Sequence, residues 1–172
     1  MPVLFARIGW MKWYRGPQPG DEKPIGGGSY NENELGGEAY NFLSLNGYVL
    51  AYFQPRRGKN QLASITLERI EAGFNGKALN DVSVVFVATD PRHAGQCIVG
   101  WYSDATVYRD EQFSKDKRRA SFSYFLKART VNAVLVPEAR RAPMIPVGKG
   151  AFGQANACYA LDINGRPKQD AE

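Results

Sequence analysis

The chain has 172 residues, 44% of them hydrophobic and 23% charged, which is the size and composition of one globular domain. It carries 22 basic and 17 acidic side chains, and the formal net charge of +5 favours a polyanionic partner. Its 1 histidine excludes from this chain an HNH nuclease, a Cys₂His₂ zinc finger and any metal site with two imidazole ligands.

The first half of the chain predicts short strands separated by turns and by one long loop. Residues 3–8 form a partly β-branched apolar run typical of a strand. Residues 16–28 hold 3 prolines and 5 glycines, so we expect a surface loop there. Strands are predicted at residues 48–54, which follow an Asn-Gly turn, and at residues 61–70, where apolar and polar residues alternate. The continuous apolar run at residues 82–88 predicts a strand buried on both faces.

The second half continues in the same way. Residues 97–102 and 106–109 predict a strand bent at its middle, and residues 121–129 and 133–136 predict two more. Short helices are expected only in two segments, residues 32–42 and 111–119. We therefore predict a mixed α+β domain that is mainly β, a closed or nearly closed β-barrel with a few short helices.

The cysteines and the hydropathy indicate the cellular compartment. Cys97 and Cys158 are too far apart for a Cys-x-x-Cys unit, and we interpret them as free thiols in a reducing cytosol. The chain has no apolar run of about 18 residues, and no signal-peptide cleavage pattern follows its first residues. We expect a cytoplasmic protein without a membrane span.

The positive charge is concentrated in one part of the chain. Residues 101–150 carry 10 basic and 5 acidic side chains, and their net charge of +5 equals that of the whole chain. Clustered cations release counterions when they meet a phosphate backbone, although an ordinary solvated loop has the same composition. The residues predicted to contact a DNA backbone are Arg109, Lys115, Lys117, Arg118 and Arg119.

Motifs for catalysis or phosphate binding are missing from the sequence. The Gly26–Gly28 triplet has neither Gly-x-Gly-x-x-Gly nor Walker spacing. His93 follows a Pro-Arg turn, and the Asp21-Glu22 pair lies in the Gly/Pro loop, where carboxylates are not rigidly placed. We predict a binding module without cofactor or metal, and an enzyme that uses Asp90, His93 or the Asp21-Glu22 pair is the alternative.

Aromatic residues are the strongest candidates for a binding pocket. The chain has 3 Trp, 9 Tyr and 9 Phe residues, and Trp10 and Trp101 each follow a glycine. Aromatic rings can sandwich a nucleobase that has been taken out of its stack, although most such rings belong to a core. We assign Trp10 and Trp101 to the pocket and leave Phe5, Phe86 and Phe125 to the core.

Four sequence stretches together resemble a known family. They are "RIGWMKWYRGPQPGDEKPIGGGSYNENELGGEAYNF", "GYVLAYFQP", "IVGWYSDATVYRD" and "AVLVPEARRAPMIPVGKGAFGQANACYA". They resemble the N-terminal domain of modification-dependent HNH restriction endonucleases, a reader of the EVE type in the PUA/YTH/SRA-like superfamily. The resemblance covers nearly the whole chain, so residues 1–160 are expected to be the reader. Residues 161–172 would be a tail or the start of a linker.

The resemblance implies a PUA-like β-barrel that flips a modified base, 5-methylcytosine or 5-hydroxymethylcytosine, from double-stranded DNA into an aromatic cage. The nuclease half is not in this chain, which is expected to bind DNA without cutting it, and an HNH nuclease domain is expected in the parent protein. The alternatives are a reader of 6-methyladenine in DNA and a YTH- or PUA-like RNA-binding module. The pocket residues carried over are Ile8, Trp10, Ser29, Tyr30, Asn31, Tyr40, Asn41, Trp101 and Tyr102.

Overall fold

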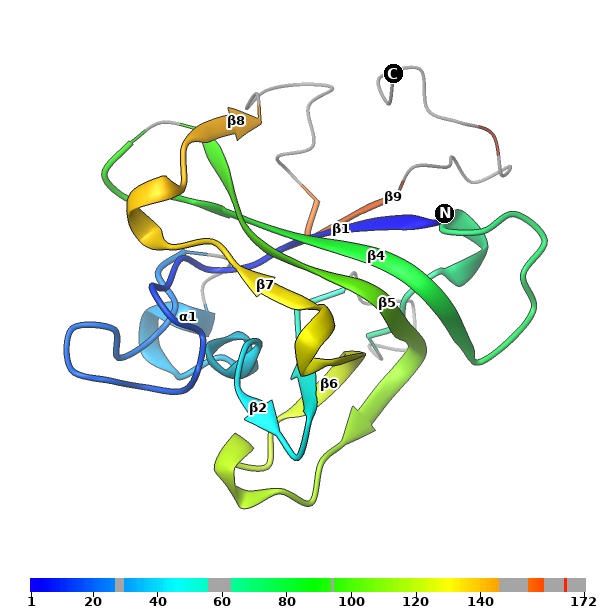
Figure 1. Ribbon diagram of the computed structural model, residues 1–172, viewed down its shortest axis with the longest axis horizontal. Coiled ribbons are helices and arrows are strands. Elements are labelled where there is room, and N and C mark those ends of the chain that lie inside the picture. The colour runs from blue at the N-terminus through cyan, green and yellow to red at the C-terminus, as the bar shows by residue number, and fades with distance from the viewer. Residues whose placement is uncertain (27–29, 56–62, 94, 146–154, 160–165, 167–172) are drawn as a thin grey trace.

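The structure is a computed structural model, and it describes residues 1–26, 30–55, 63–93, 95–145, 155–159 and 166. These residues are mainly β, with a few short helical segments, as the sequence predicts (Figure 1). The strands are β1 (Val3–Arg7), β2 (Ser44–Leu45), β3 (Tyr48–Ala51), β4 (Ala78–Thr89), β5 (Gln96–Phe113), β6 (Ser123–Arg129), β7 (Ala133–Leu135), β8 (Pro143–Ile145) and β9 (Ala157–Tyr159). The helical segments are α1 (Tyr30–Asn33) and the 3₁₀ turns η1 (Gly37–Tyr40), η2 (Leu67–Arg69), η3 (Lys117–Arg119), η4 (Thr130–Asn132) and η5 (Glu138–Arg140). No helix in the described ranges has the length and hydropathy needed to cross a bilayer.

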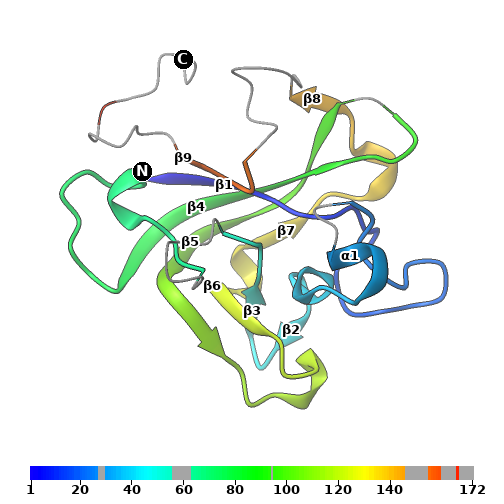
Figure 2. The same cartoon turned by 180° about the vertical axis from the view of Figure 1, so that it is seen from behind.

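All the strands belong to one mixed sheet in the order β2-β3-β6-β5-β4-β1-β9, with β7 and β8 also paired to β5. The β1–β4 pair is parallel, and the other strand pairs are antiparallel. Within the described residues the sheet is open, because its edge strands β2 and β9 have no pairing with each other. Strong curvature still brings β3 and β6 around the interior (Figures 1 and 2).

The curvature comes from β5, which changes partners along its length. Its first half pairs with β7 and β8, and its second half pairs with β6, while β4 follows it on the other side. Asp104 lies at the change with a φ of 49°. The strand predicted at residues 97–102 and 106–109 is therefore present as the continuous strand β5, with the predicted bend at its middle.

The interior is built from alternating side chains of β1, β4 and β5. Leu4 and Ala6 of β1 are fully buried, and so are Phe86 and Tyr102 on the neighbouring strands. The Phe86 and Tyr102 rings lie 4.8 Å apart at 72°, an edge-to-face contact. Gly100 faces the same interior, where a Cβ would lie 2.5 Å from the Phe42 ring. The glycine before Trp101 is therefore required by packing in the core.

Three predicted elements differ from the structure. Residues 61–70 hold the 3₁₀ turn η2 and an isolated bridge from Ser64 to Asp110, and the described part of this segment is not a regular strand. The helix predicted at residues 111–119 is wrong, because β5 continues to Phe113 and only η3 is helical. β4 is buried on both faces only over residues 86–88, since the rest of it alternates.

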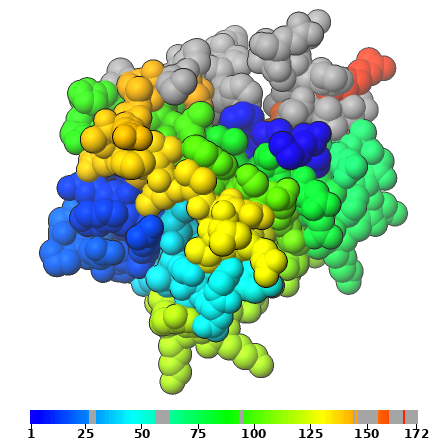
Figure 3. Space-filling model, in the orientation of Figure 1, coloured from blue at the N-terminus to red at the C-terminus, as the bar shows by residue number. Residues whose placement is uncertain are grey.

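The Gly/Pro-rich segment after β1 is tightly pinned to the rest of the molecule. Met11 and Tyr14 are fully buried, and the Tyr14 hydroxyl accepts from the Met11 N–H and donates to the Gly9 carbonyl. The Asp21 carboxylate accepts from the backbone N–H groups of Lys12 and Trp13 at 2.8 and 3.0 Å. This segment lies beside the chain that follows β7 (Figure 3).

Candidate functional site

A groove of about 260 Å³ lies at the carboxyl end of the parallel β1–β4 pair. β1 contributes Arg7 and the residue after it, Ile8, and β4 contributes Thr89 and the nearby Pro91. The third wall is the loop segment of Ile25 and Gly26, which the Trp10–Ile25 backbone bridge fastens to the end of β1. Ile25 and Pro91 thus give the groove aliphatic surface, and Arg7 is the one basic residue of its described lining.

The wall that holds Gly26 is supported by a buried polar cluster. The Asn31 side chain donates to the Gly26 carbonyl at 2.8 Å and to the Glu38 carboxylate at 3.3 Å, and the Gly9 N–H donates to the same Glu38 oxygen at 2.7 Å. A Cβ on Gly9 would lie 2.6 Å from the Pro24 Cβ, so only glycine allows this close approach. The glycine before Trp10, like the one before Trp101, is explained by packing.

Glu38 is the one carboxylate in this cluster, and its environment holds it near the point of ionisation. Burial raises the pKa of Glu38 to about 7, although the Gly9 and Asn31 hydrogen bonds and the nearby Arg7 partly oppose this. Near neutral pH both protonation states are therefore populated. Ionisation strengthens the hydrogen bonds from Gly9 and Asn31 but leaves a buried charge, and burial is the larger effect, which couples the groove wall to pH.

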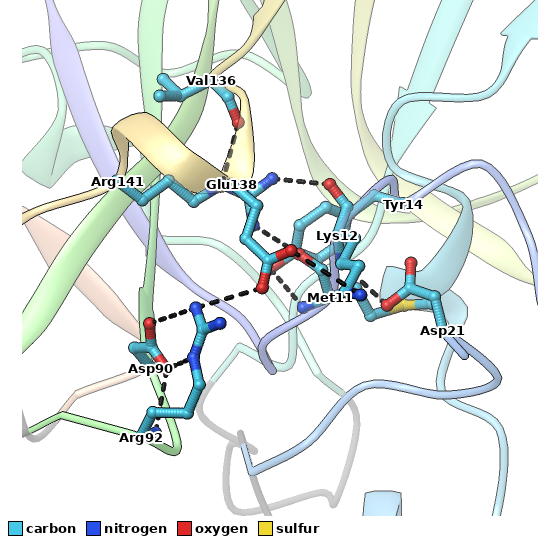
Figure 4. A network of polar contacts seen from close by, with 9 residues as sticks. All are labelled: Met11, Lys12, Tyr14, Asp21, Asp90, Arg92, Val136, Glu138 and Arg141. Atoms are coloured by element: carbon cyan, nitrogen blue, oxygen red, sulfur yellow. Dashed lines mark hydrogen bonds and ion pairs between the residues drawn. The ribbon is translucent and has the colours of Figure 1, made fainter.

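Trp10 lies under the groove wall instead of lining it. Its side chain is 4% exposed, and the guanidinium carbons of Arg92 and Arg141 lie 5.8 and 5.0 Å from its ring centroid. Arg92 pairs with Asp90 at 2.8 Å and with Glu138 at 3.1 Å (Figure 4). The Arg92 hydrogen bond lowers the pKa of Asp90 to about 2. The prediction of Trp10 as an open stacking wall is wrong, because two cations and the core enclose the ring.

The predicted pocket residues do not form one aromatic cage. Ile8 lines the groove, Asn31 supports it, and Tyr30 lies next to Asn31 with 61% of its surface exposed. Ser29 is outside the described residues. The described lining of the groove contains no aromatic ring.

The remaining predicted pocket residues lie in the core or on another face. Asn41 is fully buried and exchanges two hydrogen bonds with the backbone of Tyr52, and the Tyr102 hydroxyl donates to the Asn41 carbonyl. Tyr40 is 7% exposed, with its ring against Phe122. Their assignment to an open pocket is wrong, because packing and hydrogen bonds already occupy them. Trp101 is 38% exposed but projects from the outer face of β5, opposite the interior side of Tyr102.

The predicted DNA-backbone residues are largely neutralised or buried. Arg119 is fully buried, and it donates to the carbonyls of Leu50, Phe122 and Ser123 at 2.6, 3.2 and 2.8 Å. Burial lowers the pKa of Arg119 to about 10. The prediction that Arg119 contacts phosphate is wrong, because its donors bind the protein's own backbone.

The other four cations of that group are at the surface or partly exposed. Arg109 pairs with Glu68 at 2.8 Å, and Arg118 pairs with Asp116 at 2.6 Å. Lys115 and Lys117 are exposed. The same stretch holds Asp110, Glu111 and Asp116, and Asp116 is the partner of Arg118.

The alternative of an enzyme gains no assembled site from this geometry. In the described ranges no three or more His, Cys, Asp or Glu residues come together in a way that could hold a metal. Asp21 is bound to two backbone N–H groups, and Asp90 is paired with Arg92. Cys97 and Cys158 are both buried and are not joined in a disulfide, as the sequence predicts.

The residues that the sequence analysis missed act across long distances in the chain. Glu38 is 29 positions from Gly9, and Arg141 is 130 positions from Met11. The pairing of β1 with β4, which brings Pro91 to Ile8, has no short-range signal either. The one local signal in the sequence for this cluster is Glu38 itself, a carboxylate inside an otherwise apolar stretch.

A scan against protein-family models, a search of curated proteins and a search of solved structures each found no match to this chain.

Proposed function

We propose that this domain binds nucleic acid by taking one base into the groove at the end of the β1–β4 pair, as a PUA-like reader. The observation that carries the proposal is the groove itself, where Ile25 and Pro91 offer apolar contacts and Arg7 offers a cation. A nucleotide combines a flat, largely apolar base with an anionic phosphate, which is the complement of such a groove. The Glu38–Asn31–Gly9 cluster holds the wall in place before binding.

A 5-substituted cytosine in duplex DNA is the ligand that we put first. Flipping a base costs a few kcal/mol, which apolar contacts with Ile25 and Pro91 and a phosphate contact with Arg7 would have to offset. A cytosine methyl group buried against aliphatic side chains adds about 0.8 kcal/mol. A purely apolar contact gives modest discrimination, so we expect a backbone group at the groove to bind the exocyclic amine of cytosine and reject thymine.

6-Methyladenine in DNA and a base in single-stranded RNA are the alternative ligands, because both present an apolar methyl group and a flat ring. Cleavage would belong to a separate HNH nuclease domain in a longer protein.

A binding titration tests this function. Otherwise identical duplexes carry cytosine, 5-methylcytosine, 5-hydroxymethylcytosine or 6-methyladenine, and a methylated single-stranded RNA is the competitor. We expect tighter binding to one modified cytosine than to cytosine, and weaker competition from RNA. Equal affinity for all four duplexes, or no binding to any of them, would refute base reading.

A further inference from the structure

A second groove, of about 300 Å³, lies where the segment after β1 meets the segment after β7. Lys12, Trp13 and Arg15 form one wall. Leu135, Val136, Pro137 and Glu138 form the other. It shares no lining residue with the first groove.

The two walls of this second groove are joined by one buried arginine. Arg141 donates to the carbonyls of Met11 and Lys12 on one side and of Val136 on the other, the last two at 2.7 and 2.9 Å (Figure 4). The Asp21 carboxylate fixes the N–H groups of Lys12 and Trp13 from behind. The groove is therefore set before any ligand arrives.

The side chains of the second groove suit an anionic ligand with a flat ring. Trp13 is 40% exposed, and the Lys12 ammonium lies 5.8 Å from its ring centroid. Lys12 and Arg15 provide two cations at the wall, and the one carboxylate, Glu138, is already shared by Lys12 at 3.8 Å and Arg92 at 3.1 Å. An open indole with cations beside it is the arrangement that stacks a base and holds its phosphate.

The position of Arg92 connects the two grooves. Pro91 lines the first groove, and the next residue in the chain, Arg92, reaches Glu138 in the second. A strand with one base in the first groove would therefore present a neighbouring nucleotide to the second.

We propose that the second groove binds a flanking nucleotide of the same nucleic acid, with its base stacked on Trp13 and its phosphate near Lys12 and Arg15. This inference rests on the proposed function. It assigns sequence-independent affinity to the Trp13 groove and base preference to the β1–β4 groove, so the two can be separated by experiment.

The test compares Trp13→Ala with Trp101→Ala, a matched control in which a tryptophan of similar exposure is removed from the outer face of the sheet. Affinity is measured for duplexes that carry 5-methylcytosine or cytosine. We expect Trp13→Ala to weaken binding to both duplexes by about 10-fold while their ratio stays unchanged. Trp101→Ala is expected to change neither affinity by more than about twofold.

A second variant, Lys12→Gln with Arg15→Gln, keeps the test informative if Trp13→Ala unfolds. It is expected to weaken binding to both duplexes equally and to lower the slope of log affinity against log salt by about 2. If the wild type prefers 5-methylcytosine and these variants bind both duplexes as tightly as the wild type does, this inference is overturned and the proposed function stands. A wild type that binds no oligonucleotide would overturn both proposals, and binding of poly-glutamate in its place would point to a protein partner.

Discussion

Two regions of this molecule are each pinned by one buried arginine, yet they present opposite surfaces. In the β5–β6 connection, Arg119 binds backbone carbonyls at Leu50 and at Phe122–Ser123, and the exposed Arg118 beside it pairs with Asp116. In the region after β1, Arg141 joins two segments, and cations border two grooves. The sequence has its densest run of basic residues in the first region, and the two grooves described above lie in the second.

The difference shows that a count of charges along the chain does not locate a binding surface. A guanidinium has five N–H donors, and these can replace the water that loop carbonyls lose on burial. Such a guanidinium has no donors left for a ligand. Whether an exposed cation can bind a ligand then depends on which carboxylates lie beside it. The following predictions test this comparison, beginning with the largest expected effect.

Removing the buried indole should be far more costly than removing the exposed one. Trp10→Ala is expected to lower the free energy of unfolding by about 3–5 kcal/mol, since it leaves a cavity under Arg92 and Arg141. Trp101→Ala should lower it by less than about 1 kcal/mol, because the ring is partly solvated. Urea denaturation measures both, and equal losses would show that Trp10 is not the buried ring described above.

The two buried arginines should both be structural. Arg119→Met and Arg141→Met each leave backbone carbonyls without a partner, so each should cost about 3 kcal/mol of unfolding free energy. Arg118→Met is the matched control, because Arg118 is exposed and pairs only at the surface, and it should cost less than about 1 kcal/mol. Similar losses of unfolding free energy in all three variants would show that the two buried arginines stabilise the fold no more than an exposed one.

Glu38 should make the stability of the region after β1 depend on pH. Its pKa of about 7 in the folded state lies above the ordinary 4.5, so the folded protein binds the proton more tightly. Stability should therefore be greatest below pH 4.5 and fall as pH rises to about 7, by up to about 3 kcal/mol from this group. In Glu38→Gln this component should vanish between pH 5 and 8, as measured by urea denaturation at a series of pH values. A wild type and variant with parallel pH profiles would contradict it.

The β5–β6 connection should contribute little to nucleic-acid binding. Lys115→Gln with Lys117→Gln is expected to change affinity for any duplex by less than about twofold, because neither lysine lines either groove. If this double variant binds all duplexes more weakly, with a smaller slope of log affinity against log salt, the β5–β6 connection contacts the phosphate backbone after all.

The sequence predicts the regular part of this fold well and the groove region poorly. Strands at residues 3–7, 123–129 and 133–135 follow from local apolar patterns, and all three are present near the predicted bounds. The parallel β1–β4 pairing, the pinned Gly/Pro segment and the Arg119 and Arg141 contacts depend on residues far apart in the chain. Ile8 and Asn31 lie at the groove, whereas the ring residues Tyr40 and Tyr102 lie in the core, since aromatic composition does not separate a core from a pocket.

Filling the β1–β4 groove is the most direct test of the central claim. Thr89 is exposed at the end of β4 and lines the groove, so Thr89→Trp should occupy the space without disturbing the core. Val131→Trp, at an exposed residue outside both grooves, is the control. Binding is measured for the same duplex with cytosine and with 5-methylcytosine. We predict that Thr89→Trp loses the preference for the modified base and keeps its salt-dependent binding, while the control keeps both; a Thr89→Trp variant that still prefers the modified base would contradict base reading in this groove.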